Sequence, residues 1–260
     1  MKVVAAGADA VRPQPPGLVV LIYHRVGGGT SSAVDLPAAR FEAQVAELAE
    51  VGRLVSLAEG LGRLAAGRLA DRPVVLTFDD GTRDWVDEVL PVLERHQAPA
   101  TFYVATDFVE RQVPFPGGAE PTTWPGLAEL AASGLATIGS HTHHHALLDR
   151  VDRAVAADEL ARSVDLLGER LGIACEHFAY PKALLGSPGA EAEVRARFRS
   201  AALAGGRANP AGSDVHRLAR TPIQVTDGMG WFRRKARGGL RLEDSARSML
   251  NRRRYAGATA

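Results

Sequence analysis

The chain has 260 residues, of which 46% are hydrophobic and 23% charged, and its formal net charge at pH 7 is only +1. This is the composition of a globular protein with one large core, and it excludes a disordered chain, a collagen and a coiled coil. Cys175 is the only cysteine, which also excludes a disulfide scaffold.

The two ends of the chain differ from its centre. Residues 1–17 end in a run of proline and glycine and are expected to form a flexible lead-in. Residues 1–9 offer one lysine and only six apolar or small residues before Asp9, fewer than the roughly 7 to 15 residues of a signal peptide core, so a cytoplasmic location is expected. No segment approaches the roughly 20 apolar residues of a membrane-spanning helix. One folded domain is predicted over residues 18–232, followed by a basic tail, 233–260.

The charge of the tail contrasts with that of the domain. Residues 231–260 hold nine basic and two acidic residues, a net of +7, which leaves −6 for the rest of the chain. Such a tail is either simply solvated or makes weak contacts with anionic lipid head groups, a phosphate-bearing substrate or another subunit. No motif indicates nucleic-acid binding, and the oligomeric state is left open.

From residue 18 onward, β-type runs alternate with helical patterns. Strands are predicted at 18–23, 74–78, 101–104, 137–139, 175–179 and 201–203, and helices at 37–51, 85–96, 125–133 and 151–171. Asp35 is placed to cap the first helix. This alternation implies right-handed crossovers and a parallel sheet, either open or closed into a barrel. Residues 112–123, rich in proline and glycine, are expected to form a lid or binding loop.

Two carboxylates stand at the end of an apolar strand. Asp79 and Asp80 follow residues 74–78 directly and precede Gly81. Asp-Gly is a common turn dipeptide, so a solvated turn is one interpretation. The other is a site in which a cation neutralises one carboxylate while its neighbour takes a proton.

A histidine cluster follows another strand and favours the second interpretation. Residues 141–145 contain four of the eight histidines, directly after the strand predicted at 137–139. A surface patch is the alternative, but histidines four apart can converge on one metal ion. A carboxylate from another strand would complete three ligands and leave a position for water.

Two more strands end in polar features, at residues 23–25 and 180–182. In a (β/α) barrel the carboxyl ends of all strands share one face, where active sites lie. His24 is therefore a candidate for the same rim, although an ordinary hydrogen-bonded histidine is equally compatible with its position.

These residues resemble those of the polysaccharide deacetylase, or NodB homology, family, the fourth family of carbohydrate esterases. The first motif is present as Thr-Phe-Asp-Asp-Gly at 77–81 and the second as His-Thr-His-His-His at 141–145. Tyr-His-Arg-Val at 23–26, Pro-Ala-Thr-Phe-Tyr-Val at 99–104 and Phe-Ala-Tyr-Pro at 178–181 are similar to the branch of biofilm poly-N-acetylglucosamine deacetylases.

The resemblance implies an α/β fold, a distorted (β/α) barrel of about seven strands. It also implies a catalytic base, Asp79, and three ligands of Zn²⁺, Co²⁺ or another divalent ion: Asp80, His141 and His145. The reaction would be hydrolysis of an acetamide, and the backbone N–H of Lys182 would stabilise the oxyanion.

Departures from the family pattern lie in its later motifs. Ala179 stands where an arginine usually orients the base, and Arg220 is the candidate for the missing charge. The usual late Leu-x-His motif is absent, so the general acid is expected to be His24 in preference to His216.

The predicted substrate is an N-acetylated saccharide or small molecule, such as a short glycan, a lipid-linked or nucleotide sugar, or a natural-product intermediate. Only 6% of residues are aromatic, which argues against a long polysaccharide groove. Trp85 and Trp124 are the candidate sugar platforms, although packing in the core is equally compatible with both. Tyr180, Pro181 and Lys182 are candidates for further substrate contacts. A metal-dependent amidohydrolase of non-sugar amides and a non-catalytic carbohydrate-binding protein remain as alternatives.

Overall fold

The architecture is that of a closed parallel barrel in a computed structural model that describes residues 15–27 and 29–240. Within these residues seven strands pair in the order β1-β4-β5-β6-β7-β8-β9, and β1 pairs with β9 to close the ring. The strands are β1 (Val19–Tyr23), β4 (Val74–Asp80), β5 (Ala100–Val104), β6 (Ala136–Ser140), β7 (His177–Ala179), β8 (Ser200–Ala204) and β9 (Leu218–Pro222). The predicted seven-stranded (β/α) barrel is confirmed.

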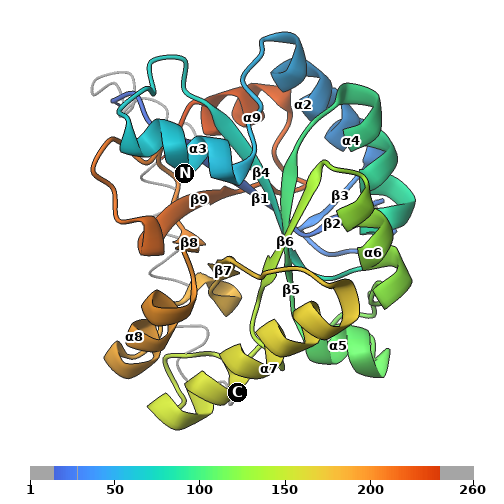
Figure 1. Ribbon diagram of the computed structural model, residues 1–260. Helices are drawn as coiled ribbons and strands as arrows, with labels where there is room; N and C mark the ends of the chain where they lie inside the picture. The colour runs from blue at the N-terminus through green and yellow to red at the C-terminus, as the bar shows by residue number, and fades with distance from the viewer. Residues whose placement is uncertain (1–14, 28, 241–260) are drawn as a thin grey trace.

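Helices surround the barrel (Figure 1). They are α2 (Ala38–Glu50), α3 (Leu57–Ala65), α4 (Leu90–His96), α5 (Thr106–Arg111), α6 (Trp124–Ala132), α7 (Arg153–Leu171), α8 (Pro188–Arg197) and α9 (Met229–Lys235). Short elements complete the chain: β2 (Arg25–Val26) paired with β3 (Asp35–Leu36), a π-helical turn η1 (Trp85–Val89), and 3₁₀ turns η2 (Pro181–Ala183) and η3 (Val215–Arg217). No helix in the described ranges is long and apolar enough to cross a membrane.

The barrel interior changes from apolar to polar along its axis. At the amino end, Leu57 and Leu64 of α3 pack with Val20 and Val75. Because side chains alternate along a strand, the residues two and four positions beyond Val75 also face inward. These residues are the polar Thr77 and Asp79. The interior of the barrel therefore becomes polar and charged toward the carboxyl ends of its strands.

The barrel is least regular between β6 and β7, which pair through one residue couple, Ser140 with Phe178. A side chain supplements this short ladder: Nδ1 of His141 lies 2.7 Å from the carbonyl oxygen of Ala179. The distortion expected for the barrel is located here, beside the histidine-rich loop.

Several predicted boundaries need correction. Asp35 does not cap α2, which begins after Pro37 without a side-chain cap, because the Asp35 carboxylate accepts hydrogen bonds from Thr30 instead. The domain boundary predicted at residue 232 falls inside α9, which continues to Lys235, and the chain is still buried at Leu240. The sequence pattern of the tail also predicts a helix near residues 242–252, and these residues lie outside the described ones.

Residues 112–123 lie against the end of β4. The backbone N–H of Thr122 donates to the carbonyl oxygen of Gly81 at 2.8 Å, and that of Arg83 donates to Glu120 at 2.9 Å. The guanidinium of Arg25 donates to the Pro116 carbonyl at 3.1 Å. This segment is therefore fastened to the rim that carries Asp79 and Asp80.

Candidate active site and metal centre

The two carboxylates at the end of β4 take different directions. Asp79 keeps the inward orientation of the strand, whereas Asp80 has a φ of 89°, which is uncommon for residues other than glycine. Gly81 follows with a φ of 123°. The turn thus separates two adjacent carboxylates, and each meets its own partners.

Asp79 is held by Arg220 inside the barrel. The guanidinium makes two parallel contacts, Nη1 to Oδ1 at 2.6 Å and Nη2 to Oδ2 at 2.8 Å. It also donates to the hydroxyl of Thr77 and lies 5.1 Å from the ring centre of Tyr103. Burial alone would raise the pKa of Asp79, but the charge of Arg220, aided by His141, holds that pKa below its usual value.

Asp80 faces two imidazoles of the histidine-rich loop. Its Oδ1 lies 3.8 Å from Nε2 of His141 and 3.5 Å from Nε2 of His145. Each of the three residues has a ligand atom within 4.8 Å of the others. The structure therefore brings together the three predicted metal ligands from two separate strand ends.

The donor set fits a divalent cation. Because the carbonyl oxygen of Ala179 can only accept a hydrogen bond, Nδ1 of His141 carries the proton and Nε2 offers its lone pair. Burial, followed by the charge of His141, lowers the pKa of His145 to about 3. Burial would raise the pKa of Asp80, but the charges of His24 and of the two loop histidines lower it overall. Neutral imidazoles with an ionised carboxylate are the forms that bind zinc and similar ions.

His24 lies at the same rim, directly after β1. Among the neighbouring charges, His24 makes the largest contribution to the lowered pKa of Asp80. Its carbonyl oxygen accepts the indole N–H of Trp85 at 3.0 Å. Its Nδ1 is buried and has no hydrogen-bond partner among the described residues.

His216 does not share this rim. It belongs to η3, which precedes β9, and its Nε2 lies 2.8 Å from the carbonyl oxygen of Phe198 just before β8. All strands are parallel, so these positions mark the amino end of the barrel. His216 is therefore too distant in the fold to act on a substrate at Asp79 and Asp80.

The residues after β7 separate into a buried and an exposed part. Lys182 is exposed, has a φ of 52°, and its charge contributes to the lowered pKa values of Asp80 and His145. Tyr180 is fully buried against Phe178, and Pro181 is also buried. The prediction that Tyr180 and Pro181 contact substrate with their side chains is not supported by this burial.

The two tryptophans differ in exposure. Trp85 is fully buried and packs against Phe102, with 5.0 Å between ring centres, so its prediction as a sugar platform is wrong. Trp124 is half-buried, its indole N–H donates to Glu110 at 2.6 Å, and the guanidinium of Arg170 lies 6.0 Å from its ring centre. A role for Trp124 in substrate binding stays a prediction.

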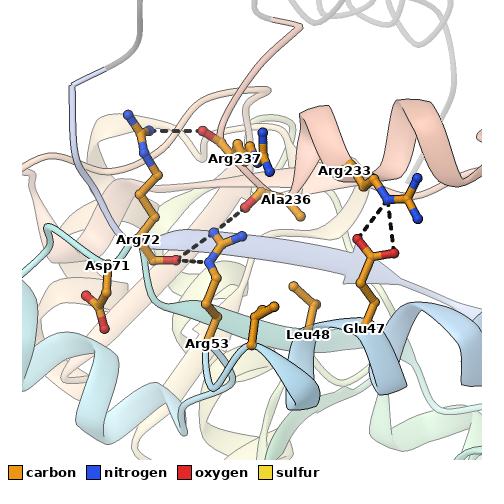
Figure 2. Close-up of a pocket in the computed structure, with 9 residues that line it drawn as sticks. Glu47, Leu48, Arg53, Asp71, Arg72, Arg233, Ala236 and Arg237 are labelled. Atoms are coloured by element: carbon orange, nitrogen blue, oxygen red, sulfur yellow. Dashed lines mark hydrogen bonds and ion pairs between the residues drawn. The ribbon is translucent and has the colours of Figure 1, made fainter.

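A basic pocket of about 500 Å³ lies at the opposite end of the barrel, between the chain preceding β4 and helix α9 (Figure 2). Arg53 donates there to the carbonyl oxygens of Arg72 and Ala236, and Arg233 pairs with Glu47. These arginines are committed to holding the chain together, and the candidate active site lies at the other rim.

Functional neighbours missed in the sequence include Thr77, Tyr103 and Glu159. Thr77 and Tyr103 both contact Arg220, and their inward position in β4 and β5 was the available signal. Glu159 of α7 accepts the backbone N–H groups of His143 and His144; no local pattern distinguishes this glutamate from those on an exposed helix face.

Comparison with known proteins agrees with the geometry. The sequence profile described as polysaccharide deacetylase matches residues 66–199, just over half of the chain. The chain belongs to the polysaccharide deacetylase family. The matched segment contains Asp79, Asp80 and the whole histidine-rich loop, whereas His24 and Arg220 lie outside it.

Two curated relatives carry the name of an activity. Poly-beta-1,6-N-acetyl-D-glucosamine N-deacetylase of Escherichia coli K12 is 31% identical over 148 residues, which are 51% of this chain and 22% of that protein. Peptidoglycan-N-acetylmuramic acid deacetylase PdaA of Bacillus subtilis is 28% identical over 120 residues, 46% of this chain and 40% of that protein. This family member therefore spans less than half the length of either relative.

Solved structures match more of the chain. IcaB from Ammonifex degensii has a TM-score of 0.71 and 28% identity, and the match covers 86% of this chain and 98% of that one. The Streptococcus pyogenes deacetylase PplD, in complex with acetate, has a TM-score of 0.75 at 22% identity and covers 85% of this chain and 99% of that one. The second likeness concerns the fold alone.

Proposed function

We propose that this chain is a metal-dependent N-deacetylase that hydrolyses the acetamide of an N-acetylated sugar to a free amine and acetate. The observation that carries the proposal is the meeting of Asp80, His141 and His145 beside an Asp79 carboxylate clamped by Arg220. The names of the two curated relatives support the reaction class.

The proposed roles follow from the positions of the side chains. A divalent cation held by Asp80 and the two histidines would supply Lewis acidity, which polarises a carbonyl oxygen and makes a water molecule more acidic. Asp79 accepts the proton of the attacking water, and Arg220 keeps this base ionised and oriented. An oxygen–carbon bond forms at the acetyl carbon, the carbon–nitrogen bond breaks, and the nitrogen must be protonated before it departs.

His24 is the proposed donor of that proton. It follows β1 directly at this rim, its charge lowers the pKa of Asp80, and its buried Nδ1 has no partner in the described part of the chain. Lys182 borders the same carboxylate and is the proposed source of oxyanion stabilisation through its backbone N–H.

We propose a short saccharide or a small N-acetylated molecule as the substrate. The chain has few aromatic residues, and one of its two candidate platforms, Trp85, is buried in the core. A long glycan bound by stacking would need aromatic faces exposed at the rim. Zinc is the proposed metal, because two imidazoles and one carboxylate form a common zinc ligand set.

The test is release of acetate from a panel of N-acetylated mono- and oligosaccharides, nucleotide sugars and non-sugar acetamides, with the bound metal measured in parallel. Asp79→Asn should retain the metal and lose at least about 10²-fold in rate, whereas Asp80→Asn should lose the metal. His24→Gln should lose rate, and the matched change His216→Gln at the other end of the barrel should not.

Each failure of this test has a distinct meaning. Metal loss in Asp79→Asn would mean that the roles of the two aspartates are exchanged. Turnover confined to non-sugar amides would favour the amidohydrolase alternative, and sugar binding without acetate release would favour a non-catalytic binding protein.

A further inference from the structure

The histidine-rich loop contains two histidines that the proposed reaction does not use. His143 and His144 lie between the ligands His141 and His145, but their rings face helix α5. The Nε2 atoms of His143 and His144 lie 3.8 Å and 3.9 Å from Oδ1 of Asp107. One ligand atom from each of these three residues lies within 4.8 Å of the others.

We propose that Asp107, His143 and His144 form a second divalent-metal site, of the zinc class, next to the catalytic one. Its ligand separations match those of the first cluster, in which the corresponding distances are 3.8 Å and 3.5 Å. In both clusters the ligand atoms would therefore move inward by a similar small amount to reach zinc ligand distances.

The outer nitrogen of each imidazole is already held. Nδ1 of His143 lies 2.9 Å from the hydroxyl of Thr106, and Nδ1 of His144 lies 2.5 Å from Oε1 of Glu159. A carboxylate only accepts, so it places the proton of His144 on Nδ1 and leaves Nε2 to bind. A ring held in this way already has a fixed orientation, so its Nε2 can bind an ion without a further loss of side-chain freedom.

Glu159 also fixes the backbone of both ligands. Its Oε2 accepts the N–H groups of His143 at 3.1 Å and His144 at 2.8 Å. The backbone N–H of Asp107 in turn donates to the carbonyl oxygen of His143 at 2.9 Å. The loop and the start of α5 are thus joined before any ion binds.

Charge and access suit a cation. Two carboxylates, those of Asp107 and Glu159, surround the imidazoles, and the nearest paired cation is Arg111, 3.7 Å from the other oxygen of Asp107. The side chains of Asp107 and His143 are mostly covered, but that of His144 is 47% exposed. This exposed edge provides an entry path and a coordination position for water.

An ion at this second site would stabilise the position of the histidine-rich loop. An ion there ties α5, which follows β5, to the loop that follows β6. The same loop carries His141 and His145, so the second ion would brace the ligands of the first.

The experiment counts zinc. Metal-free protein is dialysed against Zn²⁺ at pH 7.5, and bound zinc per folded chain is measured, with circular dichroism to verify folding. We expect two ions for the unchanged protein, one for Asp107→Asn, one for His144→Gln and one for Asp80→Asn. The double variant Asp80→Asn/Asp107→Asn should bind none, and His216→Gln, a histidine outside both clusters, should bind two.

The outcomes separate this proposal from the proposed function. One ion in the unchanged protein, retained in Asp107→Asn and lost in Asp80→Asn, would overturn the second site and leave the catalytic one standing. The converse pattern would overturn the catalytic centre alone. His144→Gln retaining two ions while Asp107→Asn loses one would overturn the ligand role of His144, and two ions in both variants would overturn the site itself.

Discussion

Arg220 supplies from β9 the positive charge that residue 179 lacks at the end of β7. A side chain on the inner surface of one strand reaches a carboxylate two strands away because the barrel is closed and β1 lies between them. Its two parallel hydrogen bonds fix the plane of the Asp79 carboxylate, which a single charged contact would leave free to rotate.

We expect Arg220→Met to lower the free energy of unfolding by about 3–5 kcal/mol, because Asp79 would remain buried without its cation. Acetate release should fall together with stability. Arg220→Lys keeps the charge but loses the paired geometry, so it should recover stability better than rate. Urea unfolding and acetate release measure the two effects.

The double variant Asp79→Asn/Arg220→Met is the control for this interpretation. It should regain part of the lost stability, since no buried charge is left over, and it should stay inactive. If the double variant were as unstable as Arg220→Met alone, the loss of stability would come from lost packing and not from the unpaired carboxylate.

Asp84 gives the chain a pH-dependent stability. Burial, with a smaller contribution from the charge of Asp35, raises the pKa of Asp84 to about 6, although its Oδ2 accepts the N–H of Val26 at 2.6 Å. The folded state therefore binds this proton more tightly than the unfolded state. The protonated Asp84 therefore contributes up to about 3 kcal/mol to the free energy of unfolding. This contribution is complete below about pH 4 and is lost as the pH rises through about 6.

Asp84→Asn keeps an acceptor for Val26 and removes the titration. We expect its free energy of unfolding to change less between pH 5 and pH 8 than that of the unchanged protein. Asp87→Asn, an exposed neighbour in the same turn, is the matched control and should keep the original slope. Equal slopes in Asp84→Asn and the unchanged protein would contradict the assignment.

At the scale of elements, helix α3 packs on the amino end of the barrel and approaches it closely at a glycine. A Cβ at Gly60 would lie 2.9 Å from a methyl carbon of Leu18 and 3.1 Å from one of Val75, whereas at Gly62 it would meet nothing within 4 Å. Gly60 is thus the point of close approach between α3 and the barrel.

Alanine at these two positions separates helix propensity from packing. Gly62→Ala should stabilise the protein by up to about 1 kcal/mol, because alanine is the better helix former. Gly60→Ala gains the same propensity but must displace Leu18, so it should be less stable than Gly62→Ala. Urea unfolding measures both, and equal effects would contradict the close approach.

Elements with strong apolar runs could be predicted from the sequence, and the others could not. Residues 74–78 are apolar almost throughout and form the first five residues of β4. β9 was missed because its sequence, Leu-Ala-Arg-Thr-Pro, is polar where it lines the charged part of the barrel. Trp85 was misassigned because an indole gives no local sign of which side of the chain it will face.

The meeting of Asp80, His141 and His145 could be predicted, since the carboxyl ends of parallel strands share one rim. The second cluster was not foreseen as a site, because it depends on Asp107 in a short helix and on Glu159 in α7. Zinc, the cytoplasmic location and the contacts of the basic tail stay predictions.

At the scale of the whole molecule, residues 233–240 belong to the folded unit. Lys235 is buried and contacts the carboxylate of Asp227 at 2.6 Å, and Arg53 donates to the carbonyl oxygen of Ala236. Figure 2 shows Arg233, Ala236 and Arg237 of this segment lining the basic pocket.

A chain that ends at residue 240 should therefore be more stable than one that ends at residue 232. We expect the shorter chain to lose several kcal/mol, since buried groups lose their partners, and to melt at a lower temperature. Thermal melting of the two truncated chains side by side measures the difference. Equal melting temperatures would place the domain boundary at 232 after all.

Asp79 and Arg220 are far apart in the sequence and come from the second and the last strands of the ring. During synthesis, the three proposed metal ligands Asp80, His141 and His145 are all made before the end of β7. Arg220, which orients the base Asp79, is made only with β9. Because β9 also closes the ring against β1, the strand that completes the fold is the one that delivers the partner of the base.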